Sequence, residues 1–195
     1  MRNVVAMETR RMKAALSLLC LLSALLAGCA TAPHAGEALH TATVDLDRYM
    51  GRWYVIASLP PRAERGHVGS FVEYSRRSDG RINALSYFRD TTFIPDLQSQ
   101  AGTATVAVDR GNAFWTIDAG WSSQDTAILY VDDDYRYAVV GRPGRDAAWI
   151  LCREIYVDDD NYEQLLSVLA ANGYDRSRVL KIPQRPEYLG LPGYQ

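Results

Sequence analysis

Residues 126–153 read TAILYVDDDYRYAVVGRPGRDAAWILCR and decide the fold class of this 195-residue chain. Three segments, 126–131, 135–141 and 148–153, have a side-chain period of two, as strands with one buried face do. Three consecutive aspartates and an Arg-Pro-Gly tripeptide separate the segments, and these residue types accept the dihedral angles of tight turns. The pattern predicts antiparallel strands joined by hairpins.

Five further segments with the same period precede this stretch. They span residues 53–58, 71–76, 81–88, 102–108 and 113–117. Eight consecutive antiparallel segments indicate an all-β fold, and an eight-stranded up-and-down β-barrel is the expected form, because closure removes exposed strand edges. A β-sandwich is the alternative that the pattern alone leaves open.

One helix is predicted after the strands. Its apolar side chains recur at i, i+3, i+4 and i+7, at Tyr162, Leu165, Leu166 and Leu169. Asp158 to Asp160 provide an N-cap and negative charge at its start, and Gly173 ends it. We expect this C-terminal α-helix to pack its apolar stripe on the outside of the barrel.

The N-terminal segment has the features of a targeting signal. Arg10, Arg11 and Lys13 precede an apolar run at 14–27, which is shorter than the about 20 residues of a membrane-spanning helix. Leu26-Ala27-Gly28-Cys29 resembles the lipobox of bacterial lipoproteins. The resemblance implies cleavage after Gly28, acylation of Cys29 and, since residue 30 is not Asp, a lipid anchor in the outer membrane.

The predicted organisation therefore has four parts. They are a signal peptide at 1–28, an acylated tether at 29–43, the barrel with its helix at 44–182, and a Pro/Gly-rich tail at 183–195 without an assigned role. The formal charge of −2 and the pI near 5.9 exclude the basic field on which nucleic-acid binding depends.

Three motifs follow one another along the predicted barrel. They are VDLDRYMGRWY at 44–54, which contains the pattern G-x-W, DYRYAVVG at 134–141, and WILCR at 149–153, which ends in arginine. Together with the predicted helix and Tyr174-Asp175, they resemble the lipocalin family over about residues 44–182, and within it the apolipoprotein D-like lipoproteins of bacterial outer membranes.

The resemblance implies a structural role for four residues at the closed floor of the barrel. These are Gly51, Trp53, Tyr135 and Arg153, with the Arg153 guanidinium lying across the Trp53 ring, a cation–π contact of about 0.5–2 kcal/mol. They are expected to close the barrel and not to contact a ligand.

A set of aromatic and apolar side chains forms the predicted ligand site. Its members are Trp149, Tyr74, Tyr87 (with Leu85 as the alternative), Trp115, Ile117, Ile128 and Tyr130. An eight-stranded barrel either fills its interior with side chains or holds one small ligand. The resemblance favours the cavity and implies binding, storage or transport of a fatty acid or lysophospholipid for membrane maintenance under stress, without a cofactor. Ala63, where relatives carry an aromatic residue, predicts a wider or less apolar entrance.

Other chemistry has little support in the sequence. Asp132 to Asp134 and Asp158 to Asp160 lack the spacing of a calcium loop and suit a turn and a helix cap, and no His or Cys pair has zinc-ligand spacing, so no metal site is predicted. Cys152 is expected on the strand face opposite to Trp149 and Arg153. No catalytic residue is predicted.

Two other functions remain open from the sequence. One is a filled barrel that acts through a protein partner in the envelope, and the other is an enzyme that acts on a hydrophobic ligand. The expected oligomeric state is a monomer or a homodimer.

Overall fold

The computed structural model describes residues 38–195. The predicted signal peptide, its cleavage site and Cys29 lie outside the described residues. Within this described part, no helix has the length and apolar character needed to cross a membrane.

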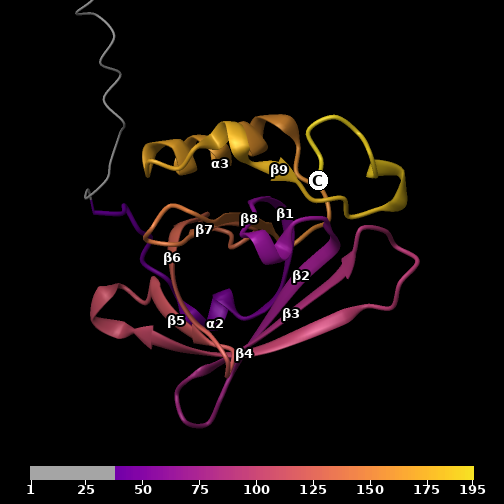
Figure 1. Ribbon diagram of the computed structural model, residues 1–195. Coiled ribbons are helices and arrows are strands. Elements are labelled where there is room, and N and C mark those ends of the chain that lie inside the picture. Colours follow the sequence, from indigo (N-terminus) through magenta and orange to yellow (C-terminus); the bar gives the residue numbers. More distant parts are fainter. Residues whose placement is uncertain (1–37) are drawn as a thin grey trace, which may run out of the picture. The chain divides into compact units, whose positions relative to one another are not determined.

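Eight strands form one closed antiparallel barrel (Figure 1). Each strand pairs with the next along the chain, and β1 pairs with both β8 and β2, which closes the sheet. This closure confirms the predicted up-and-down barrel and excludes the sandwich. The strands are β1 (Gly51–Leu59), β2 (His67–Arg76), β3 (Ile82–Asp90), β4 (Gln98–Ala107), β5 (Phe114–Asp118), β6 (Ser123–Val131), β7 (Tyr137–Gly141) and β8 (Ala148–Cys152).

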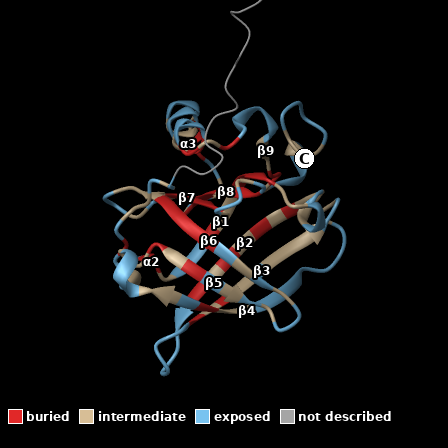
Figure 2. Cartoon of the chain, turned by 60° about the vertical axis from the view of Figure 1, so that its left-hand side comes forward, coloured by how far each residue is buried: buried red, intermediate tan, exposed pale blue. Residues whose placement is uncertain are grey.

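Helix α3 (Asp159–Ala171) packs on the outside of the barrel, as predicted. The Asp158 side chain accepts a hydrogen bond from the Asn161 backbone N–H and so caps its first turn. An outer hydrophobic cluster joins the apolar stripe of the helix to β1, β6, β7 and β8, and Figure 2 shows the buried residues of these strands in red. Cys152 belongs to this cluster, and burial raises the pKa of its thiol.

Short helices connect or flank the strands. They are α2 (Leu46–Tyr49) and the 3-10 helices η1 (Arg62–Glu64), η2 (Val108–Arg110), η3 (Arg176–Arg178) and η4 (Pro186–Tyr188). The side chain of Asp132 accepts hydrogen bonds from backbone N–H groups of the β6–β7 turn, so this aspartate shapes a turn as expected.

Bulges interrupt the strict alternation of the strands at three places. The pairing register shifts in β1 between Val55 and Ala57, in β2 between Val68 and Phe71, and in β6 between Ile128 and Tyr130. An inserted residue moves the side chains that follow it to the other face of the sheet. Leu129 is consequently a member of the outer cluster and Tyr130 packs against it, so two residues adjacent in sequence face the same side of the sheet.

The chain segments at both ends of the barrel sequence are hydrogen-bonded to it. The backbone N–H of Ala42 donates to the Ile128 carbonyl at 3.1 Å, and the N–H of His40 donates to the Asn172 side chain at 2.8 Å. Residues 38–43, the end of the predicted tether, therefore belong to the folded body. Strand β9 (Leu180–Lys181) pairs with β1 at Ala57 and Ser58, beyond the point where β2 stops pairing with β1.

Candidate functional site

The floor of the barrel is closed by Arg153 lying over Trp53. The guanidinium carbon is 3.8 Å from the centre of the indole ring, and burial lowers the pKa of this arginine. Its N–H groups donate to five backbone carbonyls, those of Arg48, Tyr49, Met50, Arg52 and Tyr135, at 2.7–3.3 Å. The cation therefore replaces the water that these carbonyls lose.

Gly51 and Tyr135 shape the same floor. Gly51 has a φ of +94°, and a Cβ at this position would lie 3.4 Å from Nη1 of Arg153. The hydroxyl of Tyr135 accepts a hydrogen bond from the Asp45 backbone N–H at 2.7 Å, and the Arg48 guanidinium lies 4.2 Å from the Tyr135 ring centre. These contacts attach the turn before β7 to α2.

An aromatic plug of four rings fills the part of the barrel interior next to the floor. It consists of Tyr49, Trp53, Tyr74 and Trp115, with ring centroids 5.0–5.7 Å apart between neighbours. The indole N–H groups of Trp53 and Trp115 donate to the Tyr49 and Asn112 carbonyls. Tyr74 forms the upper surface of the plug, and burial raises the pKa of its hydroxyl strongly.

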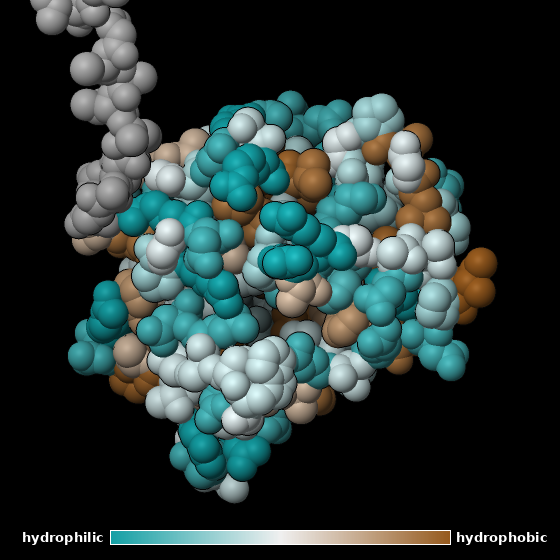
Figure 3. Space-filling view, viewed as in Figure 1, coloured by the Kyte–Doolittle hydropathy of each residue, from teal (hydrophilic) through white to brown (hydrophobic). Residues whose placement is uncertain are grey.

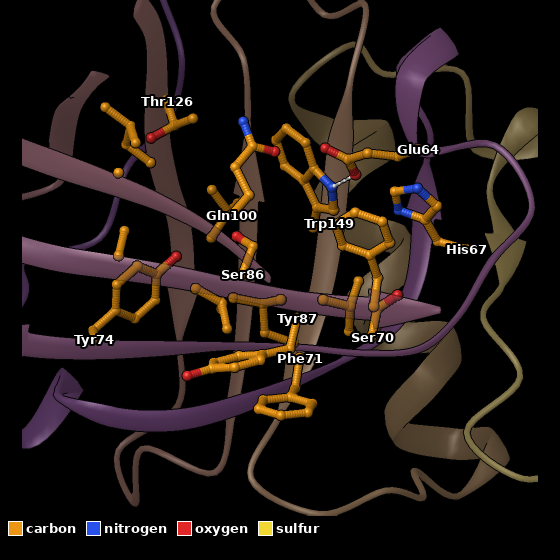
Figure 4. Close-up of a pocket in the computed structure, with 18 of the residues that line it drawn as sticks. Glu64, His67, Ser70, Phe71, Tyr74, Ser86, Tyr87, Gln100, Thr126 and Trp149 are labelled. Carbon is orange, nitrogen blue, oxygen red and sulfur yellow. Dashed lines mark hydrogen bonds between the residues drawn. The ribbon is translucent and has the colours of Figure 1, made fainter. Parts of the chain in front are cut away.

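A cavity of about 180 Å³ lies between the plug and the other end of the barrel, and its lining runs from Tyr74 to Glu64 and His67. Figure 4 shows residues that line it. Its apolar wall comes from Val55, Val72, Ala84, Ile117, Val140 and Leu151, and its polar wall from Ser70, Ser86, Gln100, Gln124 and Thr126. Ser86 and Gln100 are direct partners across β3 and β4, and Gln124 faces Ile117 across β5 and β6. The cavity is thus mixed in polarity.

Trp149 and Glu64 meet at the open end. The indole N–H of Trp149, on β8, donates to Oε2 of Glu64, on η1, at 2.8 Å (Figure 4). Burial raises the pKa of the Glu64 carboxyl, while the Trp149 hydrogen bond and the charge of Arg142 act in the opposite direction. The bond joins the β1–β2 loop to β8, the strand next to β1 at the barrel mouth.

His67 and Ser70 lie on β2 beside this pair (Figure 4). The His67 ring stacks on Phe88 with centroids 3.9 Å apart, its Nε2 lies 3.6 Å from Oδ1 of Asp90, and burial lowers its pKa. Among the described residues, the buried Ser70 hydroxyl has no hydrogen-bond partner. It is an unused polar group that faces the cavity.

The tail, to which the sequence assigned no role, supports this end of the barrel. The Gln184 side-chain amide donates to the carbonyls of Val55 and Ser70 at 2.7 and 3.1 Å. The Gln195 side chain donates to Ser58 Oγ and accepts from the Gly66 backbone N–H. The tail thereby connects β1 to β2 where the two strands no longer pair.

The structure divides the predicted ligand residues into three groups. Trp149, Tyr74 and Ile117 line the cavity. Trp115 and Ile128 belong to the inner core cluster and not to the cavity lining. Tyr130 packs against the outer cluster, because the β6 bulge reverses its face.

Tyr87 is a separate case. It is among the residues that bound the cavity, but its ring stacks on Phe71 at a centroid distance of 4.6 Å. Phe71 pairs with Tyr87 and Val72 pairs with Ser86, so the two pairs lie on opposite faces of the sheet. The Arg52 guanidinium lies 4.3 Å from the Phe71 ring centre on the outer face. Ser86 and Phe88, not Leu85 or Tyr87, supply the inward side chains of β3.

Comparison with known proteins agrees with this geometry. The family model described as lipocalin-like domain matches residues 44–184. The chain belongs to the lipocalin family. It is 30% identical to temperature-induced lipocalin-1 of Arabidopsis thaliana over 151 residues, which are 72% of this chain and 80% of that protein. It is 31% identical to outer membrane lipoprotein Blc of Escherichia coli K12 over 145 residues, 72% of this chain and 79% of that protein.

A solved structure of another protein has the same fold. Insecticyanin from the tobacco hornworm Manduca sexta superposes with a TM-score of 0.62 at 17% identity, over 83% of this chain and 92% of that chain. Lipocalins bind small hydrophobic ligands. The cavity next to the aromatic plug is lined in part by aliphatic side chains.

Proposed function

We propose that this lipocalin binds single-chain lipids of the fatty acid or lysophospholipid class without changing them chemically. Its role is to store or carry these lipids in the bacterial envelope for membrane maintenance under stress. The cavity carries the proposal, because it is closed below by the aromatic plug, open above, and lined in part by aliphatic side chains. Its volume of about 180 Å³ is below the roughly 300–1,000 Å³ typical of pockets for drug-sized molecules, which favours a thin chain over a fused ring system.

The location belongs to the same proposal. Acylation of Cys29 would hold the barrel at the outer membrane, since two or more acyl chains give stable anchoring. Relatives named outer membrane lipoprotein Blc support this location. Fractionation of cells that express the chain tests it: the protein sediments with outer membranes, and the Cys29→Ser variant does not.

Binding without catalysis is consistent with the groups at the mouth. A serine nucleophile requires a base within hydrogen-bond reach of its hydroxyl. Ser70 lies near His67 in sequence, but its hydroxyl donates to no base within the described residues. The His67 ring is instead held between Phe88 and Asp90.

Native mass spectrometry with tryptophan fluorescence tests the binding function. The Cys29→Ser chain, purified without detergent, should retain or take up one lysophospholipid and change its fluorescence on titration. Trp149→Ala should weaken binding about tenfold by removing a wall of the cavity. The control is Trp121→Ala, because Trp121 is 79% exposed. A barrel that is empty and that no acyl ligand perturbs contradicts the proposal.

A further inference from the structure

The carboxyl group of Glu64 lies at the mouth of the cavity, where few protein hydrogen bonds replace those it would form with water. Glu64 is half-buried, and burial is the main cause that raises the pKa of its carboxyl. Among the described contacts its one hydrogen-bond donor is the Trp149 indole, which bonds to Oε2. A carboxylate has about four acceptor positions, so most of those of Glu64 are unused.

The charged groups around Glu64 do not neutralise it directly. Arg142 on the β7–β8 turn acts on the carboxyl, but its guanidinium pairs with Asp146 at 3.2 Å. His67 on β2 lies near Asp90, and burial lowers its pKa, which favours the neutral ring. Arg62 on η1 and Arg65, the residue after η1, are exposed. Within residues 38–195, Glu64 forms no ion pair.

The rest of the polar wall offers hydrogen bonds without charge. The amides of Gln100 and Gln124 and the hydroxyls of Ser70 and Ser86 line the same cavity, and the Ser70 hydroxyl has no partner within the described part of the chain. A second carboxylate placed beside Glu64 would meet a like charge in a poorly solvated site, whereas an N–H or O–H donor would find a vacant acceptor.

We infer that Glu64 selects the head group of the ligand, favouring single-chain lipids whose polar end donates a hydrogen bond, above all an ammonium, over those that end in a carboxylate. The inference rests on the proposed lipid-binding function and narrows it, since it separates free fatty acids from the other candidate ligands. Glu64 acts at the polar end, while the chain lies against the aliphatic wall and Tyr74.

Three probes with one chain and different heads test the inference. Decylamine, decan-1-ol and decanoate are titrated at pH 8 while tryptophan fluorescence is recorded. We expect affinity in the order amine, alcohol, carboxylate, with about tenfold or more between the first and the last. Glu64→Gln should reduce this span to about threefold or less. The control is Glu73→Gln, which removes an exposed carboxylate that pairs with Arg52 on the outer face.

A pH series on the unmutated chain provides a second test that does not depend on a variant folding. Decanoate beside Glu64 binds more tightly when the two carboxyl groups share a proton, so its affinity should rise between pH 8 and pH 6, while that of decan-1-ol stays nearly constant.

The outcomes separate the two proposals. If decanoate binds as tightly as decylamine at pH 8, if Glu64→Gln leaves the span unchanged, or if the affinity for decanoate does not rise relative to that for decan-1-ol, the selection by Glu64 is wrong and lipid binding stands. If none of the three probes binds, the proposed function itself fails.

Discussion

The two ends of this barrel both bury a charged side chain, but they provide for it differently. At the floor, Arg153 has five carbonyl acceptors and the face of Trp53. At the mouth, Glu64 has one indole donor among the described residues, and Ser70 has no partner. The hydrogen bonds around the Arg153 cation are complete, whereas the mouth keeps unused acceptors beside a cavity. Ligand chemistry is therefore expected at the end where the polar groups are incompletely satisfied.

The largest test of this contrast is Arg153→Met. The substitution keeps much of the side-chain volume but leaves buried carbonyls without donors and removes the cation–π contact, so the free energy of unfolding should fall by about 3–5 kcal/mol. Urea denaturation measures it. Arg52→Met is the matched control, since Arg52 is exposed and pairs with Glu73, and it should cost less than about 1 kcal/mol. Equal losses would show that the floor network has no special role.

The next effect concerns the support of the mouth by the tail. Gln184→Ala removes the donor of the Val55 and Ser70 carbonyls and should lower the free energy of unfolding by about 1–2 kcal/mol. Gln164→Ala on the exposed side of α3 should change it by less than about 0.5 kcal/mol. If both variants unfold at the same urea concentration as the unmutated chain, the tail is not a structural part of the mouth.

A smaller effect tests whether the floor is as complete as the contrast requires. The hydroxyl of Tyr49 is buried without a hydrogen-bond partner in the described structure, and burial is the main cause that raises its pKa. Tyr49→Phe should therefore leave stability unchanged or raise it by up to about 1 kcal/mol. Tyr135→Phe, which removes the acceptor of the Asp45 N–H, should lower it by about 1 kcal/mol. The reverse order would indicate an unrecognised partner for Tyr49.

The smallest effect is the pH dependence that Glu64 imposes. Because burial raises the pKa of Glu64 above its ordinary value of 4.5, the folded state holds this proton more tightly than the unfolded state does. The contribution of Glu64 to stability is therefore full below the ordinary pKa and is lost as pH rises through the raised one. Relative to Glu64→Gln, the unmutated chain should lose less than about 1 kcal/mol between pH 4 and pH 7. A relative gain over that interval would contradict the burial of the carboxyl.

Alternation in the sequence was sufficient for the barrel but not for every side chain within it. The eight period-two segments correspond to the eight strands, because a strand with one buried face leaves that pattern in any sequence. The prediction that Tyr130 faces the barrel interior was wrong. A bulge reverses which residues of a strand face inward, and the residue composition of the strand does not reveal it. Tyr87 was predicted as an inward residue because it is aromatic. Its ring instead lies on the outer face, where it stacks on Phe71.

The polar part of the site was harder to predict. Glu64 lies in a hydrophilic loop between two arginines, where nothing distinguishes it from a solvated surface residue. Its contact with Trp149 depends on how that loop folds back over the barrel. The positions of Gln100 and Gln124 could have been predicted from strand alternation. Each lies two residues before a residue that lines the cavity, Gly102 and Thr126 respectively.

Cys152 provides the molecule with a chemical reporter of one particular motion. It is the one cysteine of residues 38–195, and its thiol lies in the cluster that joins α3 to β8. The residue is 1% exposed, and its sulfur contacts Glu154 and Tyr156 in the segment that leads to α3. An alkylating reagent therefore reaches the sulfur only when this part of the outer cluster opens, and the raised thiol pKa slows the reaction further. Comparison of the alkylation rate under native conditions with the rate of global unfolding shows whether the outer cluster opens alone or together with the whole barrel.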